Sequence, residues 1–137
     1  PDAGGEGFSF RARLLRLREF QLSAQVRLAL AFLEGVLSAA DCARHLAEIG
    51  DLVVQQVLAL ARDELRSRYG EPGGAAGTGF AVLGYGSLGG QELNFASDLD
   101  LVFVYEDRLA ESDSDGPSVI DGQRWFGRLA QRVLALL

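Results

Sequence analysis

Asp98 and Asp100 are spaced as a pair that could bind a divalent cation. On a β-strand, residues two apart project to the same side with Cα atoms roughly 6.5 Å apart, so both carboxylates are expected at the N-terminal end of one strand. Two adjacent anions are costly unless a cation joins them. Mg²⁺ takes oxygen ligands and usually reaches phosphate through them. The pair therefore predicts a magnesium site for a phosphate-bearing substrate.

A glycine-rich turn shortly before the pair strengthens this interpretation. Gly86 and Ser87 offer unobstructed backbone amides and a hydroxyl, and a short helix beginning near Ser87 would direct its N-terminal N–H groups at an anion. An isolated Asp-x-Asp is more often a turn and a cap, but the phosphate-type turn favours the metal site. A two-metal site with ions about 4 Å apart would position an attacking hydroxyl and stabilise a leaving pyrophosphate.

The same segment also satisfies the G-x-G-x-x-G pattern of dinucleotide-binding folds. Its glycines are Gly84, Gly86 and Gly89, and Glu106 lies roughly where such folds place a ribose-binding acid. That fold needs a full crossover helix between its strands, and Gly89-Gly90 would break such a helix after one turn. The dinucleotide interpretation is therefore disfavoured.

Two amphipathic helices are predicted to form an antiparallel scaffold ahead of the turn. The first runs from about Phe8 to Leu37, and the apolar residues that track one broad stripe on it are Leu15, Leu22, Val26, Leu30, Leu33 and Leu37. Gly35 marks where it loosens, and Ser38 with Asp41 forms a capping box for the second helix. That helix runs to about Tyr69, and its expected buried side comprises Leu46, Val53, Val54, Val57, Leu58, Ala61 and Leu65.

From residue 70 to about Ile120 the apolar residues no longer follow the helical spacing of the first two helices. The Gly-rich run 70–79 predicts a domain boundary or mobile loop, and the apolar runs 80–83 and 99–105 predict short strands, the second of a kind buried on both faces. Residues 106–118, which include Asp107, Glu111, Asp113 and Asp115, predict a solvated loop, and a last amphipathic helix follows from about Ile120 through Trp125, Phe126, Leu129, Val133 and Leu136. The expected class is α+β, with a helical hairpin over 1–70, a linker over 71–79 and a further domain over 80–137.

Composition narrows the classes of partner. The net charge is −6 and the sequence has no lysine, so no basic stripe is available for nucleic acid. Cys42 has no second cysteine to pair with, and with His45 as the one histidine a zinc cluster cannot be assembled. Arginines interrupt every long apolar stretch and no signal peptide is visible, which predicts a cytoplasmic protein without a membrane segment. The lack of methionine and the first residue, Pro1, predict a piece of a longer polypeptide.

The Gly-Ser turn followed by Asp-x-Asp resembles the nucleotidyltransferase superfamily that includes DNA polymerase β. The longer string from Gly84 to Leu101 looks specifically like the glutamine synthetase adenylyltransferases. Flanking segments look like the same family: Val53-Val54-Gln55-Gln56, Ile120-Asp121-Gly122-Gln123 and Leu129-Ala130-Gln131-Arg132. The resemblance implies that residues 80–137 are the N-terminal part of a polymerase β-like nucleotidyltransferase core.

This resemblance also implies an activity and its residues. The family carries two such domains, one that transfers AMP from ATP to a tyrosine of glutamine synthetase and one that removes it by phosphorolysis; the flanks favour the adenylylating half and leave the removing half open. Asp98 and Asp100 would be catalytic and bind Mg²⁺, while the nucleotide would be held by Gly86, Ser87, Gly89, Gly90 and Ser97. Glutamine synthetase, and a PII-type signalling protein acting on the whole enzyme, are the implied partners.

A third catalytic aspartate is implied on a later strand, beyond Leu137, so the chain alone should bind nucleotide poorly and catalyse little. Two other functions stay open. The chain could be a noncatalytic regulatory or docking module that keeps the loop, or part of a small-molecule nucleotidyltransferase, although the flanking helices lend the latter no support.

Overall fold

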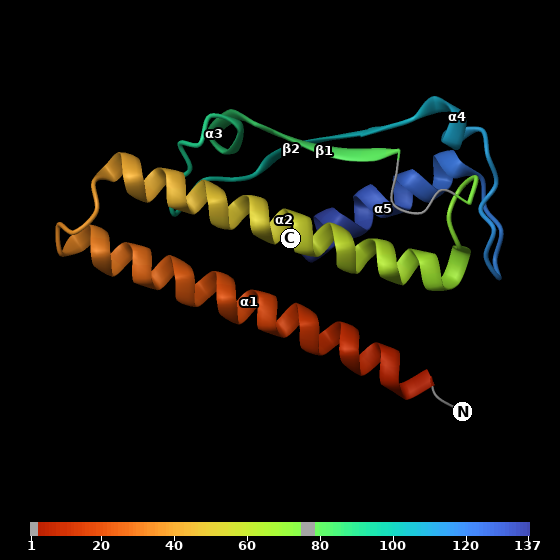
Figure 1. Ribbon diagram of the computed structural model, residues 1–137, viewed down its shortest axis with the longest axis horizontal. Coiled ribbons are helices and arrows are strands. Elements are labelled where there is room, and N and C mark those ends of the chain that lie inside the picture. The colour runs from red at the N-terminus through yellow and green to blue at the C-terminus, as the bar shows by residue number, and fades with distance from the viewer. Residues whose placement is uncertain (1–2, 75–78) are drawn as a thin grey trace. The chain divides into compact units, whose positions relative to one another are not determined.

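The computed structural model describes residues 3–74 and 79–137. Five helices and two strands follow one another, as labelled in Figure 1: α1 (Ala3–Leu33), α2 (Ala39–Tyr69), β1 (Phe80–Tyr85), α3 (Gly86–Gly89), β2 (Asp100–Tyr105), α4 (Asp107–Ala110) and α5 (Gly122–Leu136). The predicted α+β class and helical N-terminal part are confirmed. No described helix has the length and apolar character needed to cross a membrane.

Contacts between Cα atoms group the chain into two compact units. The first comprises residues 1–56 and 84–100, and the second comprises 57–83 and 101–137. The domain boundaries expected from the sequence stay a prediction, and residues 75–78 of the expected linker lie outside the described part of the chain.

In the first unit, α1 and the beginning of α2 run side by side in opposite directions (Figure 1). Gly35 ends α1 in the left-handed conformation at φ +72°. The N–H of Gly35 donates to the Phe32 carbonyl and that of Val36 to the Ala31 carbonyl, at 3.0 and 2.9 Å. This pair of bonds is the Schellman motif, which satisfies carbonyls that the helix end leaves open. Gly35 marks where the helix loosens, as predicted, but the helix ends at Leu33 and does not continue to the predicted end at Leu37.

Half of the predicted capping box of α2 is present: the Ser38 hydroxyl oxygen accepts a helix N–H as predicted, but the Asp41 carboxylate accepts from the Ser38 hydroxyl and not from a backbone amide. The Asp41 N–H donates to Ser38 Oγ at 3.1 Å, and the Ser38 hydroxyl donates to the Asp41 carboxylate at 2.6 Å. That second bond, more than the nearby Arg44 and His45, holds the pKa of Asp41 below its usual value. The first turn of α2 thus has a charge-assisted cap, which explains why the helix begins at Ala39.

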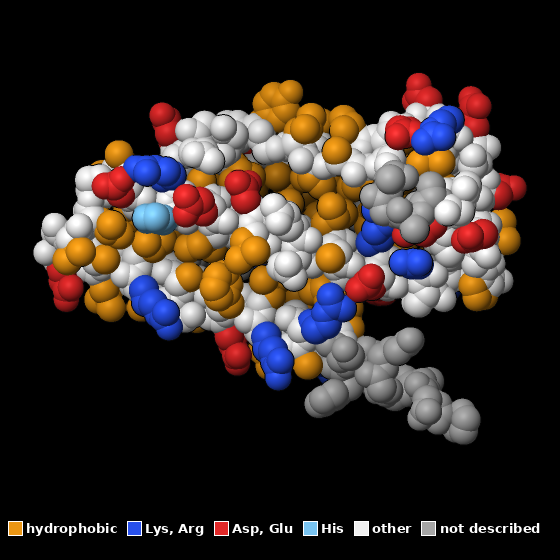
Figure 2. Space-filling view, viewed as in Figure 1, with side chains coloured by type: hydrophobic (Ala, Val, Ile, Leu, Met, Phe, Trp, Pro, Cys, Tyr) orange, Lys and Arg blue, Asp and Glu red, His pale blue; other side chains and the backbone are white. Residues whose placement is uncertain are grey.

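The buried face of α1 differs from the predicted one. Five of the six residues of the predicted stripe, Leu15, Leu22, Val26, Leu30 and Leu33, are exposed by 49% or more. A different row, spaced alternately by four and three positions, is half-buried: Phe10, Leu14, Leu17, Gln21, Ala24, Leu28 and Ala31. The helix carries apolar residues on more than one side, so their helical period could not identify the inward side. Figure 2 shows hydrophobic side chains reaching the surface between arginine and acidic side chains.

In the second unit, α5 packs its aromatic side chains against the end of α2 and the sheet. The side chains predicted to line its buried face are 5% exposed or less: Trp125, Phe126, Leu129, Val133 and Leu136. Six of the seven α2 residues predicted to be buried are buried, three of them (Leu46, Val53 and Val54) in the first unit, while Leu58 is half-buried and Leu60 is buried in addition. The ring of Phe126 stacks on Phe80 and Tyr105 at centroid distances of 5.9 and 4.9 Å.

The two strands pair as an antiparallel sheet, because the N–H of Glu106, just after β2, donates to the carbonyl of Gly79, just before β1. The prediction that the second strand is buried on both faces is wrong for the described part of the chain. Val102 and Val104 are 44% and 41% exposed, while Leu101 and Phe103 between them are half-buried. Only one face of the sheet packs on α5.

The acidic segment after β2 is more ordered than predicted. It contains α4, buries Leu109 and Ser114, and forms isolated bridges that join Pro72 to Ser114 and Asp113 to Asp121. Asp115 accepts a hydrogen bond from the Glu71 N–H at 2.8 Å. Short-range charge suggested a solvated loop, whereas these contacts depend on residues far away in sequence.

Candidate nucleotide and metal site

The carboxylate of Asp100 lies directly against the glycine turn. Gly86 adopts φ +54°, and a Cβ atom placed on it would lie 2.5 Å from Oδ2 of Asp100. Asp100 is the first residue of β2 and Gly86 follows β1, so pairing of the two strands brings the turn and the acid together. Only a residue without a side chain permits this approach. A glycine at position 86 is therefore explained by the structure, in addition to its predicted role in binding the nucleotide.

The predicted short helix after β1 is present as α3, which has four residues. Its N-cap residue, Tyr85, makes no side-chain cap bond, and N–H groups in a first helical turn have no acceptor inside the helix. Ser87 is exposed in this turn. Because so short a helix has little dipole, any phosphate contact here would come from individual N–H groups and the Ser87 hydroxyl.

Gly89 and Gly90 close this turn tightly. A Cβ atom on Gly89 would lie 2.6 Å from the Gly84 carbonyl oxygen, and the Gly90 N–H donates to the Gly86 carbonyl at 2.9 Å. The helix ends here, as predicted, and no crossover helix connects β1 to β2. This confirms the geometric objection to a dinucleotide-binding unit.

Ser97 shapes the loop between α3 and β2. Its hydroxyl oxygen accepts the Asn94 N–H at 3.0 Å, and the Asn94 side-chain oxygen accepts the Ala96 N–H at 2.8 Å. The Ser97 hydroxyl still has its own hydrogen to donate. The predicted nucleotide contact of Ser97 would therefore use a group that also orders the loop.

Asp98 lies in this loop rather than on the strand. Because β2 begins at Asp100, the strand alternation that predicted a common side for the two acids does not extend to Asp98. The side chain between them, Leu99, approaches Gly50 of α2, and both Asp98 and Asp100 are exposed. The loop thus presents two carboxylates to solvent on either side of an inward leucine.

Gly50 is an anchoring residue that the sequence interpretation missed. A Cβ atom on it would lie 3.2 Å from Leu88 Cδ1 and 3.7 Å from the Cδ2 atoms of Leu93 and Leu99. These three leucines belong to α3 and the loop around the acids, so Gly50 is a point at which α2 contacts that loop. The available signal was a glycine inside a helix, where it costs about 1 kcal/mol relative to alanine.

The donor set fits part of a magnesium shell. Mg²⁺ is usually held by one or two carboxylates, with substrate phosphates and water completing its octahedron. Asp98 and Asp100 would supply that number. Within the described residues, no group of three or more histidine, cysteine or acidic side chains is placed to hold a metal.

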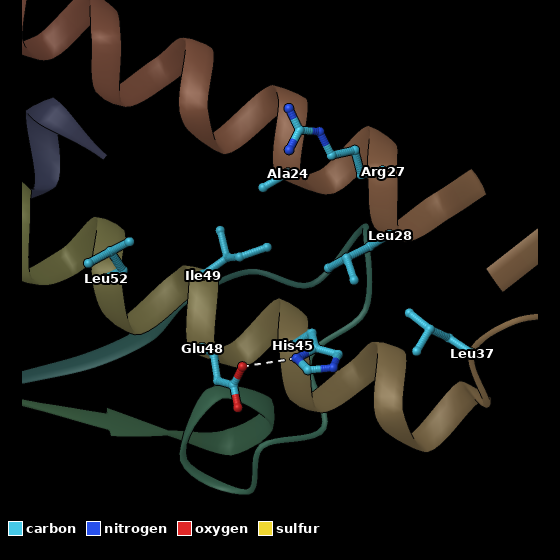
Figure 3. A pocket seen from close by; sticks show the side chains of 8 residues that line it. All are labelled: Ala24, Arg27, Leu28, Leu37, His45, Glu48, Ile49 and Leu52. Atoms are coloured by element: carbon cyan, nitrogen blue, oxygen red, sulfur yellow. Dashed lines mark hydrogen bonds and ion pairs between the residues drawn. The ribbon is translucent and has the colours of Figure 1, made fainter. Parts of the chain in front are cut away.

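Two hollows of the first unit are lined entirely by residues that the structure describes. Figure 3 shows one of about 420 Å³ between α1 and α2, where Ala24, Leu28, Leu37 and Ile49 surround an apolar space and His45 contacts Glu48 at 3.0 Å. Another, of about 190 Å³, lies where Leu93 and Phe95 of the loop meet α1 and α2. None of the predicted site residues lines either of these two hollows, and the glycines of the turn, Ser87 and both acids are exposed.

Comparison with known proteins identifies relatives over nearly the whole chain. Residues 8–137 match the family model described as glutamate-ammonia ligase adenylyltransferase. The chain is similar to a bifunctional glutamine synthetase adenylyltransferase/adenylyl-removing enzyme of Xanthomonas axonopodis pv. citri (strain 306), with 49% identity over 92% of the chain and 13% of the relative. Proteins of the same description from Stenotrophomonas maltophilia (strain R551-3) and Idiomarina loihiensis (strain ATCC BAA-735 / DSM 15497 / L2-TR) are 47% and 43% identical, each over 88% of the chain and 13% of the relative. The chain thus spans about an eighth of the length of these relatives.

Proposed function

The chain belongs to the glutamate-ammonia ligase adenylyltransferase family, and on this premise we propose that its glycine turn and acid pair are part of a nucleotidyltransferase site. The reaction is transfer of AMP from ATP to a tyrosine hydroxyl of glutamine synthetase. One structural observation supports this site in addition to family membership: the Asp100 carboxylate lies against the backbone of Gly86. A metal-binding acid and a phosphate-binding turn must be neighbours if both are to act on one triphosphate.

The proposed roles follow from the chemistry of each group. Asp98 and Asp100 hold Mg²⁺, and the exposed Ser87 hydroxyl donates to a phosphate oxygen together with N–H groups near Gly86. When bound, the metal would lower the negative charge of the phosphates and stabilise the leaving group. The tyrosine oxygen gives up its proton to solvent and forms a bond to the α-phosphorus, the bond from the α-phosphorus to the bridging oxygen breaks, and pyrophosphate leaves. Gly89, Gly90 and Ser97 maintain the turn and loop that carry these donors.

A second activity has specific support, because the name of the relatives pairs adenylyl transfer with adenylyl removal. The same turn and acids would then bind phosphate and the AMP group in phosphorolysis. The flanking helices resemble the adenylylating half, so transfer is the lead proposal. Glutamine synthetase is the proposed protein substrate, and a PII-type signalling protein the proposed regulator of the whole enzyme.

The test replaces each acid in the full-length gene product. Asp98→Ala and Asp100→Asn should each lower AMP transfer to glutamine synthetase on the order of 100-fold or more, the scale seen when one group that stabilises transition-state charge is lost. Asp51→Asn, at an exposed acid on α2 in the same unit, is the matched control and should leave transfer unchanged.

The outcome separates the candidate functions. Transfer that persists while phosphate-dependent AMP removal is lost would assign the site to the removing half. If both activities and Mg²⁺-dependent ATP binding are unaffected by either substitution, the loop is not a nucleotide site and a docking function becomes the better interpretation.

A further inference from the structure

Tyr69, at the end of α2, is contacted by two arginines from different helices. The guanidinium carbons of Arg68 on α2 and Arg128 on α5 lie 5.2 and 4.9 Å from the centroid of its ring. Arg128 also donates a hydrogen bond to the Tyr69 hydroxyl oxygen. Tyr69 is buried, while both arginines are exposed. Cation–π contacts with one ring therefore place two guanidinium groups close together on the surface.

The positive charge of this cluster is not balanced by the chain. Within the described residues, no carboxylate lies within ion-pair distance of Arg68 or Arg128. Arg132 also lines the cluster and pairs with Glu64 at 2.7 Å, which offsets one of the three positive charges. The cluster therefore has a local excess of two positive charges on a protein of net charge −6.

The arginines are not needed to satisfy the end of the helix. The N–H groups of Ser118 and Gly116 donate to the carbonyls of Arg68 and Tyr69 at 3.2 and 2.9 Å. The Trp125 indole N–H donates to the Gly70 carbonyl at 2.9 Å. These carbonyls have other partners, so apart from the N–H that Arg128 donates to the Tyr69 hydroxyl, the guanidinium donors are not used at the helix end.

A hollow lies over the cluster. It has a volume of about 480 Å³ and is lined by Arg68, Tyr69, Arg128, Gln131, Arg132 and Glu64, among others. The Tyr69 hydroxyl accepts from Arg128 and can still donate its own hydrogen, and the Gln131 amide can donate as well. The donors thus come from two helices and border one space.

We propose that this cluster is a binding site for a phosphate-type oxyanion, either inorganic phosphate or a terminal phosphoryl group. Arg68 and Arg128 supply the charge-assisted hydrogen bonds, and the hydroxyl of Tyr69 supplies a third donor. The site uses residues of the second compact unit only and does not depend on the proposed nucleotidyltransferase function.

Phosphate fits this donor set better than a carboxylate does. A carboxylate presents two oxygens in one plane and is satisfied by a single guanidinium fork. A phosphate presents oxygens in tetrahedral directions, and donors on two helices with a hydroxyl between them can reach several of these at once. Its charge near −2 also matches the local excess.

The test is calorimetric titration of the full-length gene product with inorganic phosphate at constant ionic strength, with chloride as the balancing anion. We expect saturable binding that weakens at least tenfold in Arg68→Gln/Arg128→Gln. Arg44→Gln/Arg124→Gln removes the same charge from exposed positions on the same two helices and should bind phosphate like the unmodified protein. Tyr69→Phe keeps the ring and should weaken binding by a smaller factor.

The remaining outcomes identify the ligand or remove the site. Titration with glutarate distinguishes phosphate from the carboxylates of an acidic segment, and glutarate that binds as tightly as phosphate would overturn the assignment to phosphate. Unsaturable binding, or equal weakening in both double variants, would show general charge attraction only. Competition by pyrophosphate or ATP would indicate that the bound group is the phosphoryl end of a larger molecule.

Discussion

Replacing Gly86 by alanine tests the contact that carries the proposed function. An alanine at φ +54° costs about 1–2 kcal/mol because its Cβ is crowded in the left-handed region. The new Cβ would also lie 2.5 Å from Asp100 Oδ2, so the carboxylate must rotate away, at a cost of roughly 0.5–1.5 kcal/mol if it leaves its rotamer. The free energy of unfolding should thus fall by about 1.5–3.5 kcal/mol.

Gly35→Ala is a matched control. Gly35 has φ +72°, and a Cβ atom there would meet nothing within 4 Å. This variant should lose only the conformational cost of about 1–2 kcal/mol. The difference between the two variants measures displacement of Asp100 separately from backbone strain.

The assay combines urea unfolding with Mg²⁺-dependent ATP binding in the full-length gene product. Gly86→Ala should weaken metal-dependent binding tenfold or more, while Gly35→Ala should leave it unchanged despite its own loss of stability. Full binding by Gly86→Ala would refute the idea that the carboxylate must lie against this turn. Equal weakening in both variants would attribute the effect to general destabilisation.

Three further changes test the parts that support the site. Trp125→Phe should lower the free energy of unfolding by about 1–3 kcal/mol in urea titrations, because it leaves the buried carbonyl of Gly70 without its indole donor. Ser38→Ala should lower stability at neutral pH, and the loss should shrink as the pH falls below 3.8, because Asp41 has a lowered pKa in the folded state and its stabilising bond disappears on protonation. Gly50→Val should weaken metal-dependent ATP binding more than it lowers the midpoint of urea unfolding, because the added methyls push on the leucines that anchor the acid loop.

Each of these has a result that would contradict it. A Trp125→Phe protein as stable as the original would mean that water replaces the indole donor. A stability loss in Ser38→Ala that is constant down to pH 2 would exclude the Asp41 carboxylate from the cap. Undisturbed ATP binding in Gly50→Val would show that the acid loop is positioned by other contacts.

The helices and the core of the second unit could be predicted from the sequence because their signals are local. Ser38 and Asp41 mark the start of α2, Gly35 and Gly70 mark helix ends, and Trp125 to Leu136 repeat at helical spacing. These features depend on residues within one or two turns of each other. The short helix at Gly86 followed from the same kind of local pattern.

Features that depend on distant residues were missed or predicted wrongly. The inward face of α1 depends on which side meets α2, and both sides of α1 carry leucines. The acidic segment is ordered by contacts of Asp115 and Ser114 with Glu71 and Pro72, which no local pattern shows. Gly50 is explained only once the loop that packs on it is known.

The proposed site combines both kinds of information. The sequence identified Gly86, Ser87, Asp98 and Asp100 by residue type and spacing, and strand pairing brings Asp100 to the turn at a distance that only glycine tolerates. Strand pairing does not place Asp98. The position of Asp98 depends on the loop before β2, which is ordered by the hydrogen bond of Ser97 and by the contact of Leu99 with α2. Because Gly50 lies against leucines on both sides of the loop, Leu88 and Leu93 before it and Leu99 beside the acids, the geometry of the acid pair should be more sensitive to Gly50 than the stability of the fold is. If metal binding and the free energy of unfolding change in proportion across substitutions of Gly50, the loop does not move separately from the fold. The positions of Asp98 and Asp100 would then be determined by the sheet alone.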